Sequence, residues 1–561
     1  MTGYTLRSAA ALGWLTITTV ACGDTSNSTA TGTSADTSVT ADPTTGNDDA
    51  TTTTTATTAD TSATQEPTGD TTADPGTTGP IFDVGVLDDS GDTGEPIDVC
   101  KVGDDGSGVG PCRKIAPADS FTPELQWSWA GDAEFNDSIV TPLVANMTDD
   151  NGDGEIDLCD VPDVLVTVNA GSCGDAHLYL LDGATGTLHY EIETPVARAS
   201  TPAIGDIDGD GLPEIVAQTG STNGCSGSSI TAWDHDGSFK WNNNSLGLTG
   251  EHAIALADLD NDGDVEIMIN NRVLDHNGVL VHALADNDVG QYWTSATAAD
   301  LDGDGDLEVV LGRSAWHHDG TPLFNNGNVA SGHPAIGDIS GDGDPEIIVI
   351  QASGFTILDN TGAVVLGPVN PTGDGDWRRP ATIHDLDGDD QSEFAVSSSN
   401  RYTSFEGDGT INWSAPVADF SGLASGTAFD FLGDGVAEAI YADETSLWVF
   451  DGLTGDVQLQ APRGSITIIE YPVVVDVDND GSSEIVVVTN HNDAHPVVQV
   501  YRDAEDRWIQ ARRVWNQHTY HVTNVREDST IPQFEAPHWE ALNTFRTNAQ
   551  IEGGSVCRPE G

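Results

Sequence analysis

Residues 206–214 read DIDGDGLPE, and this acidic stretch lies between two short apolar runs at residues 201–204 and 215–217. A third apolar run follows at 229–233, then the turn Asp-His-Asp-Gly at 234–237 and a last short run at 238–241. Short runs separated by turn residues are typical of β-strands rather than helices. The unit therefore predicts four short strands, with the acidic loop between the first and the second.

The same unit recurs along the chain at an average spacing of about 47 residues. Its acidic loops begin at Asp149, Asp206, Asp258, Asp300, Asp338, Asp385, Asp430 and Asp476. Four strands in a repeat of this length are typical of β-propeller blades, because one small sheet cannot bury both faces alone. The turns leave no room for crossover helices, so the strands must be antiparallel. We predict an all-β propeller of four-stranded blades, eight if each loop marks one blade, or seven if a degenerate copy is absorbed elsewhere.

Residues 125–129, Leu-Gln-Trp-Ser-Trp, precede the first loop and have the character of a fourth strand without its own blade. A propeller must close into a ring. We therefore expect this segment to pair with the last blade, next to residues 497–501, and so to join the two ends of the chain.

The loop pattern Asp-x-Asp-x-Asp-Gly places three carboxylates at alternate positions of a tight turn, which suits a hard cation such as calcium. An EF-hand would need an acid at position 12 and flanking helices. Position 12 is instead apolar in the second, third and fourth loops, at Ala217, Ile269 and Leu311. An acid occurs at position 9, and β-branched residues follow, so each predicted calcium loop connects two strands.

These loops resemble the FG-GAP or VCBS repeats of bacterial surface proteins and the blades of integrin α-subunit propellers. The resemblance covers residues 121–510, about 70% of the chain. It implies a calcium ion between the first and second strands of each blade, held by side chains at positions 1, 3, 5 and 9 and by the position-7 carbonyl. The second copy offers only Pro202-Ala203-Ile204-Gly205 for the integrin-type signature, so VCBS is the better match.

Transferred to this chain, the resemblance predicts about six or seven Ca²⁺ sites. Five loops have all four acids: Asp206, Asp208, Asp210 and Glu214; Asp258, Asp260, Asp262 and Glu266; Asp300, Asp302, Asp304 and Glu308; Asp385, Asp387, Asp389 and Glu393; Asp476, Asp478, Asp480 and Glu484. The first loop is a variant with Asp149, Asn151, Asp153 and Asp157. In the sixth loop Asp390 replaces the turn glycine, which aspartate tolerates because it can adopt left-handed conformations.

Two loops depart from the pattern. The fifth has Ser340 between Asp338 and Asp342, with Glu346 at position 9, so we expect weaker binding there. The seventh has Leu432 at position 3, and we expect little or no metal in it.

The chain of 561 residues carries 91 acidic and 19 basic side chains, a formal charge of −72. Such a balance excludes a nucleic-acid binder and a protein that adheres to anionic membranes, because both depend on lysine and arginine. No nucleotide-binding, zinc-protease or nucleophile-elbow motif occurs.

The first 21 residues have the features of a signal peptide: one cation, Arg7, then an apolar run at 9–20. The sequence ending in Ala21-Cys22 resembles a bacterial lipobox, which implies lipidation of Cys22. Residues 22–97, rich in threonine and aspartate, predict a disordered linker. Residues 98–120 form a cysteine-containing lead-in to the propeller. We expect an exported protein of the cell envelope or surface, lipid-anchored or alternatively secreted.

With Cys22 lipidated, six cysteines remain, which predicts three disulfides among about 15 connectivities. Cys173 and Cys225 follow the second strands of adjacent predicted blades, so we expect them to pair. Cys100 with Cys112 would close a small glycine-rich loop. That leaves Cys159 with Cys557.

Residues 511–561 break the repeat. Aromatic, histidine and arginine residues concentrate at 512–525, and the segment resembles one that follows the repeats in related bacterial proteins. The segment is interpreted either as a cap that plugs the propeller and closes its last blade, or as a binding or catalytic surface at the channel mouth. His317-His318 is interpreted as surface, with a metal site as the alternative.

Three functions fit the sequence. The first is a non-enzymatic binding or adhesion module for an unknown protein or glycan; we expect a monomer that contacts a membrane only through its lipid anchor. The second is a calcium-dependent polysaccharide lyase, since some such lyases are eight-bladed calcium propellers; its substrate-neutralising cations would come from Arg378, Arg379 and Arg401. The third is a structural envelope component.

Overall fold

The computed structural model describes residues 100–101, 109–117, 120–171, 175–220, 227–285, 295–371, 375–420, 423–490 and 495–559. All of them belong to one unit. The predicted signal peptide, Cys22, the linker, Cys173 and Cys225 lie outside the described residues. Among the described residues, no helix is long and apolar enough to cross a membrane.

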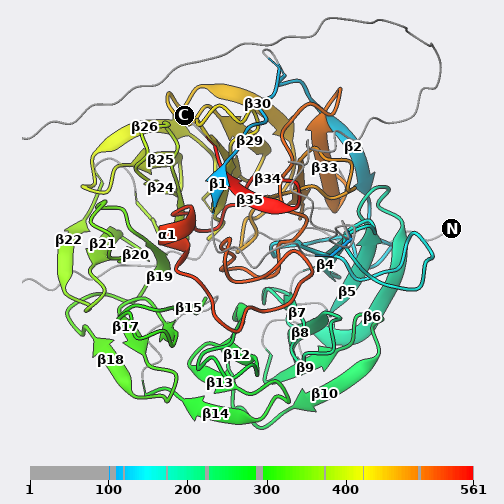
Figure 1. The fold of residues 1–561 in the computed structure, drawn as a ribbon, viewed down its shortest axis with the longest axis horizontal. Helices are drawn as coiled ribbons and strands as arrows, with labels where there is room; N and C mark the ends of the chain where they lie inside the picture. Colours follow the sequence, from blue (N-terminus) through cyan, green and yellow to red (C-terminus); the bar gives the residue numbers. More distant parts are fainter. Residues whose placement is uncertain are drawn as a thin grey trace, which may run out of the picture. The chain divides into compact units, whose positions relative to one another are not determined.

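The described strands form eight four-stranded antiparallel blades arranged in a ring (Figure 1). The first four blades are β3 (Leu143–Ala145), β4 (Asp163–Asn169), β5 (Ala176–Asp182) and β6 (Leu188–Val196); β7 (Ala203–Gly205), β8 (Glu214–Thr219), β9 (Ser229–Trp233) and β10 (Phe239–Asn243); β11 (Ile254–Ala257), β12 (Glu266–Ile269), β13 (Arg272–Leu274) and β14 (Leu280–Ala283); β15 (Thr297–Ala299), β16 (Glu308–Val310), β17 (Ser314–Trp316) and β18 (Pro322–Asn325). The first two blades also share one bridging pair, Val196 of β6 with Thr219 of β8.

The other four blades continue the ring. They are β19 (His333–Gly337), β20 (Glu346–Gln351), β21 (Gly354–Leu358) and β22 (Val364–Val369); β23 (Thr382–His384), β24 (Glu393–Ser397), β25 (Arg401–Phe405) and β26 (Ile411–Pro416); β27 (Gly426–Phe429), β28 (Glu438–Ala442), β29 (Ser446–Phe450) and β30 (Val457–Pro462); β31 (Val473–Val475), β32 (Glu484–Val488), β33 (Val498–Asp503) and β2 (Pro123–Trp129). The predicted all-β fold with four-stranded blades is confirmed, and the eight-bladed form is the one observed.

The predicted ring closure is also confirmed. Strand β2, from the start of the propeller sequence, pairs antiparallel with β33, near its end, over six residue pairs from Pro123 with Asp503 to Trp129 with Val498. Figure 1 shows the two strands side by side, blue against orange. The eighth blade is therefore assembled from both ends of the propeller sequence.

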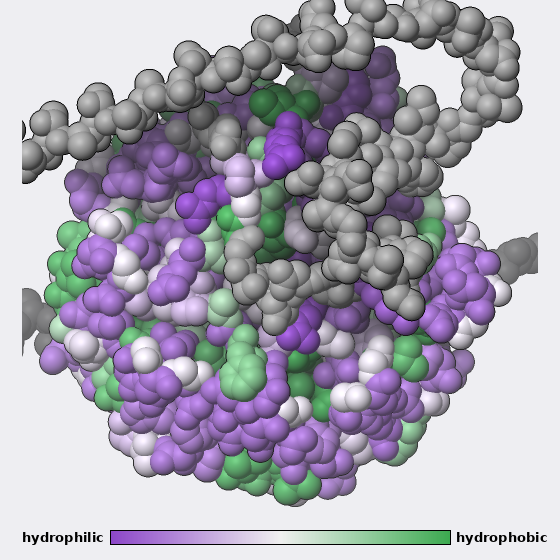
Figure 2. All heavy atoms as spheres, viewed as in Figure 1, coloured by the Kyte–Doolittle hydropathy of each residue, from purple (hydrophilic) through white to green (hydrophobic). Residues whose placement is uncertain are grey.

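Burial decreases from the centre of the ring to its rim. The first three strands of each blade are largely buried, whereas the fourth strands, such as β10 and β22, are partly or fully exposed. The core lies between neighbouring blades: one cluster of buried residues joins Val216 and Ile230 of the second blade to Ile254 and Ile267 of the third. In Figure 2 the visible face is mainly hydrophilic, with hydrophobic residues scattered toward the rim.

A recurrent contact joins one blade to the next. The ring of Trp241 on β10 covers Gly278, where an added Cβ would clash with the indole, and its Nε1 donates to the carbonyl of His276 at 3.0 Å. Trp413 covers Gly455 in the same way, and a Cβ added there would lie 2.7 Å from the indole. Only glycine leaves room for the ring at this turn, and its positive φ suits the turn as well.

The same contact operates across the ring closure. Trp127 of β2 covers Gly186 of the first blade, where an added Cβ would lie 2.5 Å from the ring, and its Nε1 donates to the carbonyl of Gly183 at 2.6 Å. The closing strand thus uses the packing that the continuous blades use.

The segment after residue 511 fills the centre of the ring. Its backbone or side chains bond to, or next to, the first strand of all eight blades: Trp515 with Val144, Asn516 with Ile204, Gln517 with Leu256, Thr519 with Ala296, His538 with Ile336, Phe545 with Ile383, Arg546 with Thr427, and Asn548 with Val474. Figure 1 shows the segment in red across the centre, with the four-residue helix α1 (His538–Ala541). Of the two interpretations, the structure favours a plug, but the last blade is closed by β2.

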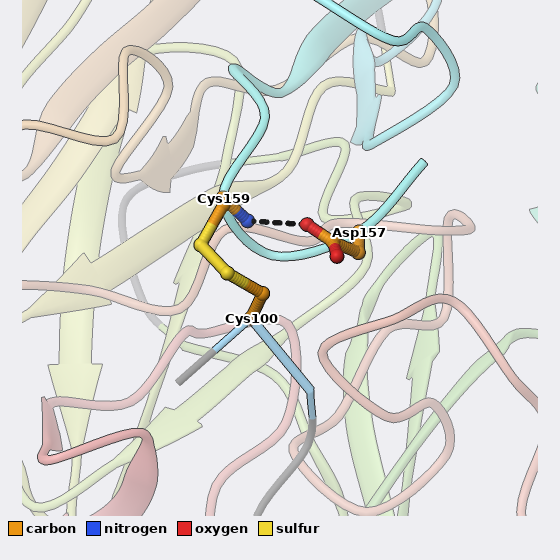
Figure 3. Close-up of side chains that lie close together, drawn as sticks. All are labelled: Cys100, Asp157 and Cys159. Carbon is orange, nitrogen blue, oxygen red and sulfur yellow. Dashed lines mark hydrogen bonds between the residues drawn. A yellow bond between two sulfur atoms is a disulfide. The ribbon is translucent and has the colours of Figure 1, made fainter. Parts of the chain in front are cut away.

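The disulfide predictions for four cysteines were wrong. Cys100 bonds to Cys159, and Cys112 bonds to Cys557 (Figure 3 shows the first pair). Residues 110–111 form strand β1 (Gly110–Pro111), which runs parallel to β35 (Ser555–Arg558), and β34 (Ile551–Glu552) completes this small sheet. This pairing puts Cys112 beside Cys557. The two cysteines of the lead-in are therefore attached to different parts of the molecule and do not close on each other.

Replacing Trp127 with alanine should destabilise the ring at its closure. The side chain is 8% exposed, and loss of such a buried tryptophan costs about 3–5 kcal/mol. Trp413→Ala is the matched control, because Trp413 is 6% exposed and makes the same contact inside the continuous chain. We expect both variants to lose stability in urea unfolding, but only Trp127→Ala to become sensitive to proteolysis near residues 120–130. Equal proteolysis of the two variants would contradict a special role of the closure.

Candidate functional site

Each acidic loop connects the first strand of a blade to the second, and its first aspartate organises the turn. In the second loop, Asp206 accepts hydrogen bonds from the backbone N–H groups of Gly209 at 2.8 Å and Gly211 at 2.9 Å. The seven other loops repeat this arrangement in whole or in part. In the sixth loop Asp390 adopts φ 67°, so aspartate does take the left-handed conformation predicted for it.

The glutamate at position 9 begins the second strand and reaches back into the loop. In seven blades its Oε2 accepts the N–H of the position-2 residue at 2.7–3.2 Å. This bond fixes one carboxylate oxygen on the backbone and leaves Oε1 beside the aspartates. The repeated sequence therefore places a second-strand carboxylate against the loop in each of these blades.

The first loop is built differently. Strand pairing sets Ala145 opposite Asp163, where the other blades have their position-9 glutamate, and Asp163 accepts the N–H of Met147 at 3.0 Å. Asp157, the sequence-predicted position 9, instead accepts the N–H of Cys159 at 2.9 Å, next to the disulfide (Figure 3). The sequence analysis did not identify Asp163 as a loop residue. Its position directly before the apolar run at 164–168 could have indicated this role, because the other blades have their position-9 glutamate at the start of the second strand.

Three loops contain a cationic or ionisable partner that the sequence analysis did not identify. Lys240 on β10 lies 2.6 Å from Asp208, 2.9 Å from Glu214 Oε1 and 2.9 Å from Asp234. In the fourth blade, His317 Nδ1 lies 2.9 Å from Glu308 Oε1, so this histidine belongs to the loop rather than to a free surface. In the first blade, His189 Nε2 lies 3.1 Å from Asp163.

Other loops leave buried carboxylate oxygens without any partner among the described residues. Oε1 of Glu393 and Oε1 of Glu484 are buried and accept no hydrogen bond, and the same holds for Oδ1 of Asp387. Glu393 and Glu484 are both 0% exposed. An uncompensated buried carboxylate oxygen is costly, so the sixth and eighth loops are the places where a cation is most needed.

The electrostatics of the loops agree with this geometry. Burial, with the neighbouring aspartates, raises the pKa of Glu266 and of Glu393 to about 8. In the loops with a partner the shift is smaller: burial raises the pKa of Glu214 and of Glu308 to about 7, against the effect of Lys240 and His317. Burial also raises the pKa of Glu484 well above its ordinary value.

The two atypical loops differ in their surroundings. In the fifth, the backbone N–H of Ser340 donates to Glu346 Oε2 at 3.1 Å. The seventh is covered by the lead-in: the carbonyl of Leu432 accepts the N–H of Ala116 at 2.7 Å, and a Cβ on Gly433 would lie 2.6 Å from the carbonyl oxygen of Lys114. The seventh loop therefore serves as a docking point for residues 114–116.

A cavity of about 320 Å³ lies between the loops of the fifth to seventh blades and the C-terminal segment. Its lining includes Asp385, Gln391, Trp539, Asn543 and Arg558. In such a cavity the indole ring can stack on an apolar ring face of a ligand, and the surrounding polar groups can form hydrogen bonds to its hydroxyl groups. The sequence did not indicate this cavity, because its walls come from segments far apart in the chain.

Comparison with solved structures finds several matches. The V. cholerae biofilm matrix protein Bap1 matches with a TM-score of 0.70 at 20% identity, covering 78% of this chain and 100% of that chain. The chain shares the propeller fold of Bap1. The rhamnogalacturonan lyase YesW matches at 0.48 and 15% identity, covering 80% and 83%, and the Bacillus licheniformis lyase PL11 at 0.46 and 15%, covering 78% and 82%. No protein-family model and no curated protein matches the chain.

In a chelator, the stability of this protein should fall as the pH rises from about 6.5 to 8. The folded pKa of Glu266 and Glu393 is about 8, above the ordinary 4.5, so the folded chain binds more protons than the unfolded chain across this window. At lower pH the buried His252 and His333, whose pKa values burial lowers to about 4 and about 3, contribute the opposite trend. The measurement is urea unfolding against pH.

The control for this pH dependence is the double variant Glu266→Gln with Glu393→Gln, which removes two of the titrating groups while keeping their shape. Its stability should depend less on pH across the same window than that of the wild type. A wild-type stability that rises across the window would contradict the assignment.

Proposed function

We propose that this protein is an exported, calcium-stabilised β-propeller that acts as a non-enzymatic binding module at the cell surface, held by a lipid on Cys22. Two disulfides join the lead-in to the propeller and to the C-terminal segment, which supports an oxidising, extracellular location. The resemblance of the loops to FG-GAP and VCBS repeats supports calcium.

The observation that carries the calcium proposal is the set of orphaned oxygens in the sixth and eighth loops. Oε1 of Glu393, Oε1 of Glu484 and Oδ1 of Asp387 are buried without partners among the described residues. Hard oxygen donors on a flexible turn are the donor set that Ca²⁺ prefers. Bound calcium would supply the positive charge that these carboxylates lack.

The loops are not equal candidates. The sixth and eighth fit best, with ligands at Asp385, Asp387, Asp389 and Glu393, and at Asp476, Asp478, Asp480 and Glu484. The second loop already has the Lys240 ammonium among its carboxylates, so we expect weaker calcium binding there. The first loop would use Asp163 in addition to the residues identified from sequence.

The cavity beside Trp539 supports a binding role, with a glycan as the ligand of best chemical fit. Carbohydrate rings present apolar faces to indoles and hydroxyls to carboxylates and amides, and Trp539, Asp390 and Gln391 line the cavity together. Its volume of about 320 Å³ is at the lower end of small-ligand sites, which suits a short saccharide.

The arginines of the blades argue against a lyase. Arg379 is 0% exposed and bonds to Asp419, Arg378 lies 2.7 Å from Asp376, and Arg401 bonds to Ser414 at 2.7 Å. A lyase must neutralise the carboxylate of its substrate, and these three guanidinium groups are engaged within the protein. We therefore favour the non-enzymatic module over the enzyme and over a purely structural component.

Calcium should raise the melting temperature, and Glu393→Gln should bind about one calcium fewer per chain than the wild type. At a hundredfold Kd, each site contributes about 2.7 kcal/mol. The matched control is Glu438→Gln in the seventh loop: Glu438 accepts the N–H of Phe431 at 3.2 Å, as Glu393 accepts that of Leu386, but its loop has Leu432 at position 3. Metal analysis after dialysis gives the stoichiometry. An unchanged melting curve in EDTA would refute the proposal.

Glycan binding is tested on a glycan array in calcium, followed by calorimetry with the best ligand. Trp539→Ala should weaken binding by roughly thirtyfold, the effect of a residue worth about 2 kcal/mol. Phe534→Ala is the control, because Phe534 is 71% exposed and does not line the cavity. Equal effects of both variants would exclude the cavity, and ultraviolet absorbance from unsaturated products on uronic-acid polysaccharides would establish a lyase instead.

A further inference from the structure

Three side chains of the C-terminal segment form a cluster that contains none of the predicted calcium ligands. The nitrogen and oxygen atoms that His521, Glu535 and His538 can offer to a metal all lie within 4.8 Å of one another. The cluster is buried: His521 and His538 are each 1% exposed, and the Glu535 side chain is 5% exposed. It thus brings two imidazoles and one carboxylate together where water has little access.

The two histidines are oriented by backbone carbonyls on the side away from the cluster. Nδ1 of His521 faces the carbonyl oxygen of Thr519 at 3.0 Å, and Nε2 of His538 faces that of Ile336 at 2.9 Å. A carbonyl oxygen only accepts, so each of these nitrogens carries a proton. In the neutral rings the lone pairs are then on Nε2 of His521 and Nδ1 of His538. This is how metal-binding histidines are usually held.

Glu535 places negative charge where the first of these lone pairs lies. Its Oε1 is 2.6 Å from Nε2 of His521 and also accepts from Thr523 Oγ1 at 3.1 Å. Both nitrogens of His521 therefore face acceptors, which a neutral imidazole with one N–H cannot satisfy. Either an additional proton lies between Nε2 of His521 and Oε1 of Glu535, or the lone pair and the carboxylate share a metal ion with His538, whose ring centre lies 4.5 Å from that of His521.

We propose that His521, Glu535 and His538 form a binding site for a divalent transition metal, zinc by its chemistry. Two imidazoles and one carboxylate are a donor set typical of zinc, whereas calcium prefers all-oxygen sites. Tetrahedral zinc, with bonds of about 2.0–2.2 Å, holds neighbouring ligand atoms roughly 3.3 Å apart. Nε2 of His521 and Oε1 of Glu535 lie 2.6 Å apart, so zinc binding requires the Glu535 carboxylate to withdraw by roughly 0.7 Å.

The site has a clear place in the fold. His538 opens α1 and bonds to the innermost strand of the fifth blade through Ile336, while Thr519 bonds to the carbonyl of Ala296 next to the fourth. A metal bound to His521 and His538 would cross-link the two ends of the segment 521–538. Trp539 follows His538 directly, so the bound metal would also restrict the position of Trp539, which lines the cavity.

The test uses the full chain, expressed with zinc in the medium and dialysed against calcium to keep the acidic loops saturated. Mass-spectrometric metal analysis should find about one zinc per chain in the wild type, as one site of this donor set requires. His521→Gln and Glu535→Gln should each weaken zinc binding by more than roughly tenfold, since even the loss of a residue that only supports a ligand has an effect of that size. His518→Asn is the control, a buried histidine of the same segment outside the cluster.

Cobalt substitution gives a second readout that does not depend on variant folding. Co²⁺ in the wild type should show the visible absorption bands of a low-coordinate, nitrogen-ligated ion, and zinc should abolish them by displacement. Glu535→Gln should lose the bands while keeping the calcium-dependent melting temperature. A folded, calcium-binding wild type that retains no zinc and shows no cobalt bands would overturn the proposal and assign the close contact of His521 with Glu535 to a shared proton.

Discussion

The structure depends on one set of backbone hydrogen bonds, those between β2 and β33. Without β2 the eighth blade would have only three strands, with the largely buried β33 as its outer edge, and an exposed strand edge is prone to fraying and to pairing with other chains. Here the six residue pairs of β2 with β33 complete the eighth sheet, and Trp127 packs on the first blade. Only in a closed ring can the C-terminal segment reach the first strands of all eight blades.

Much of the fold could be predicted from sequence because the acidic loops recur in register with the strands. The repeat predicted eight blades with seven as the alternative, and the orphan run at 125–129 identified the closing strand. The disulfides could not be predicted, because the partners of Cys100 and Cys112 depend on where the first blade and the C-terminal strand β35 lie. No local pattern in the sequence records that tertiary arrangement.

The geometry of the candidate sites was predictable only where it follows from local register. The position-9 glutamate reaches back into its loop in seven blades because it stands where the loop meets the second strand. Lys240 and His189 were missed, because a fourth-strand residue reaches the loop only through the register between the third and fourth strands. His521 and His538 lie 17 residues apart, and nothing in that spacing indicated that they meet.

The Cys100–Cys159 disulfide has a mechanical consequence. A pulling force applied to the chain on the amino-terminal side of Cys100 passes through the sulfur atoms into the first blade at Cys159. It therefore bypasses β2, whose hydrogen bonds to β33 would otherwise separate one after another from the end of the strand. Because the covalent bond carries such a force past the pairing of β2 with β33, a load from this side would reach the first blade without separating the two strands.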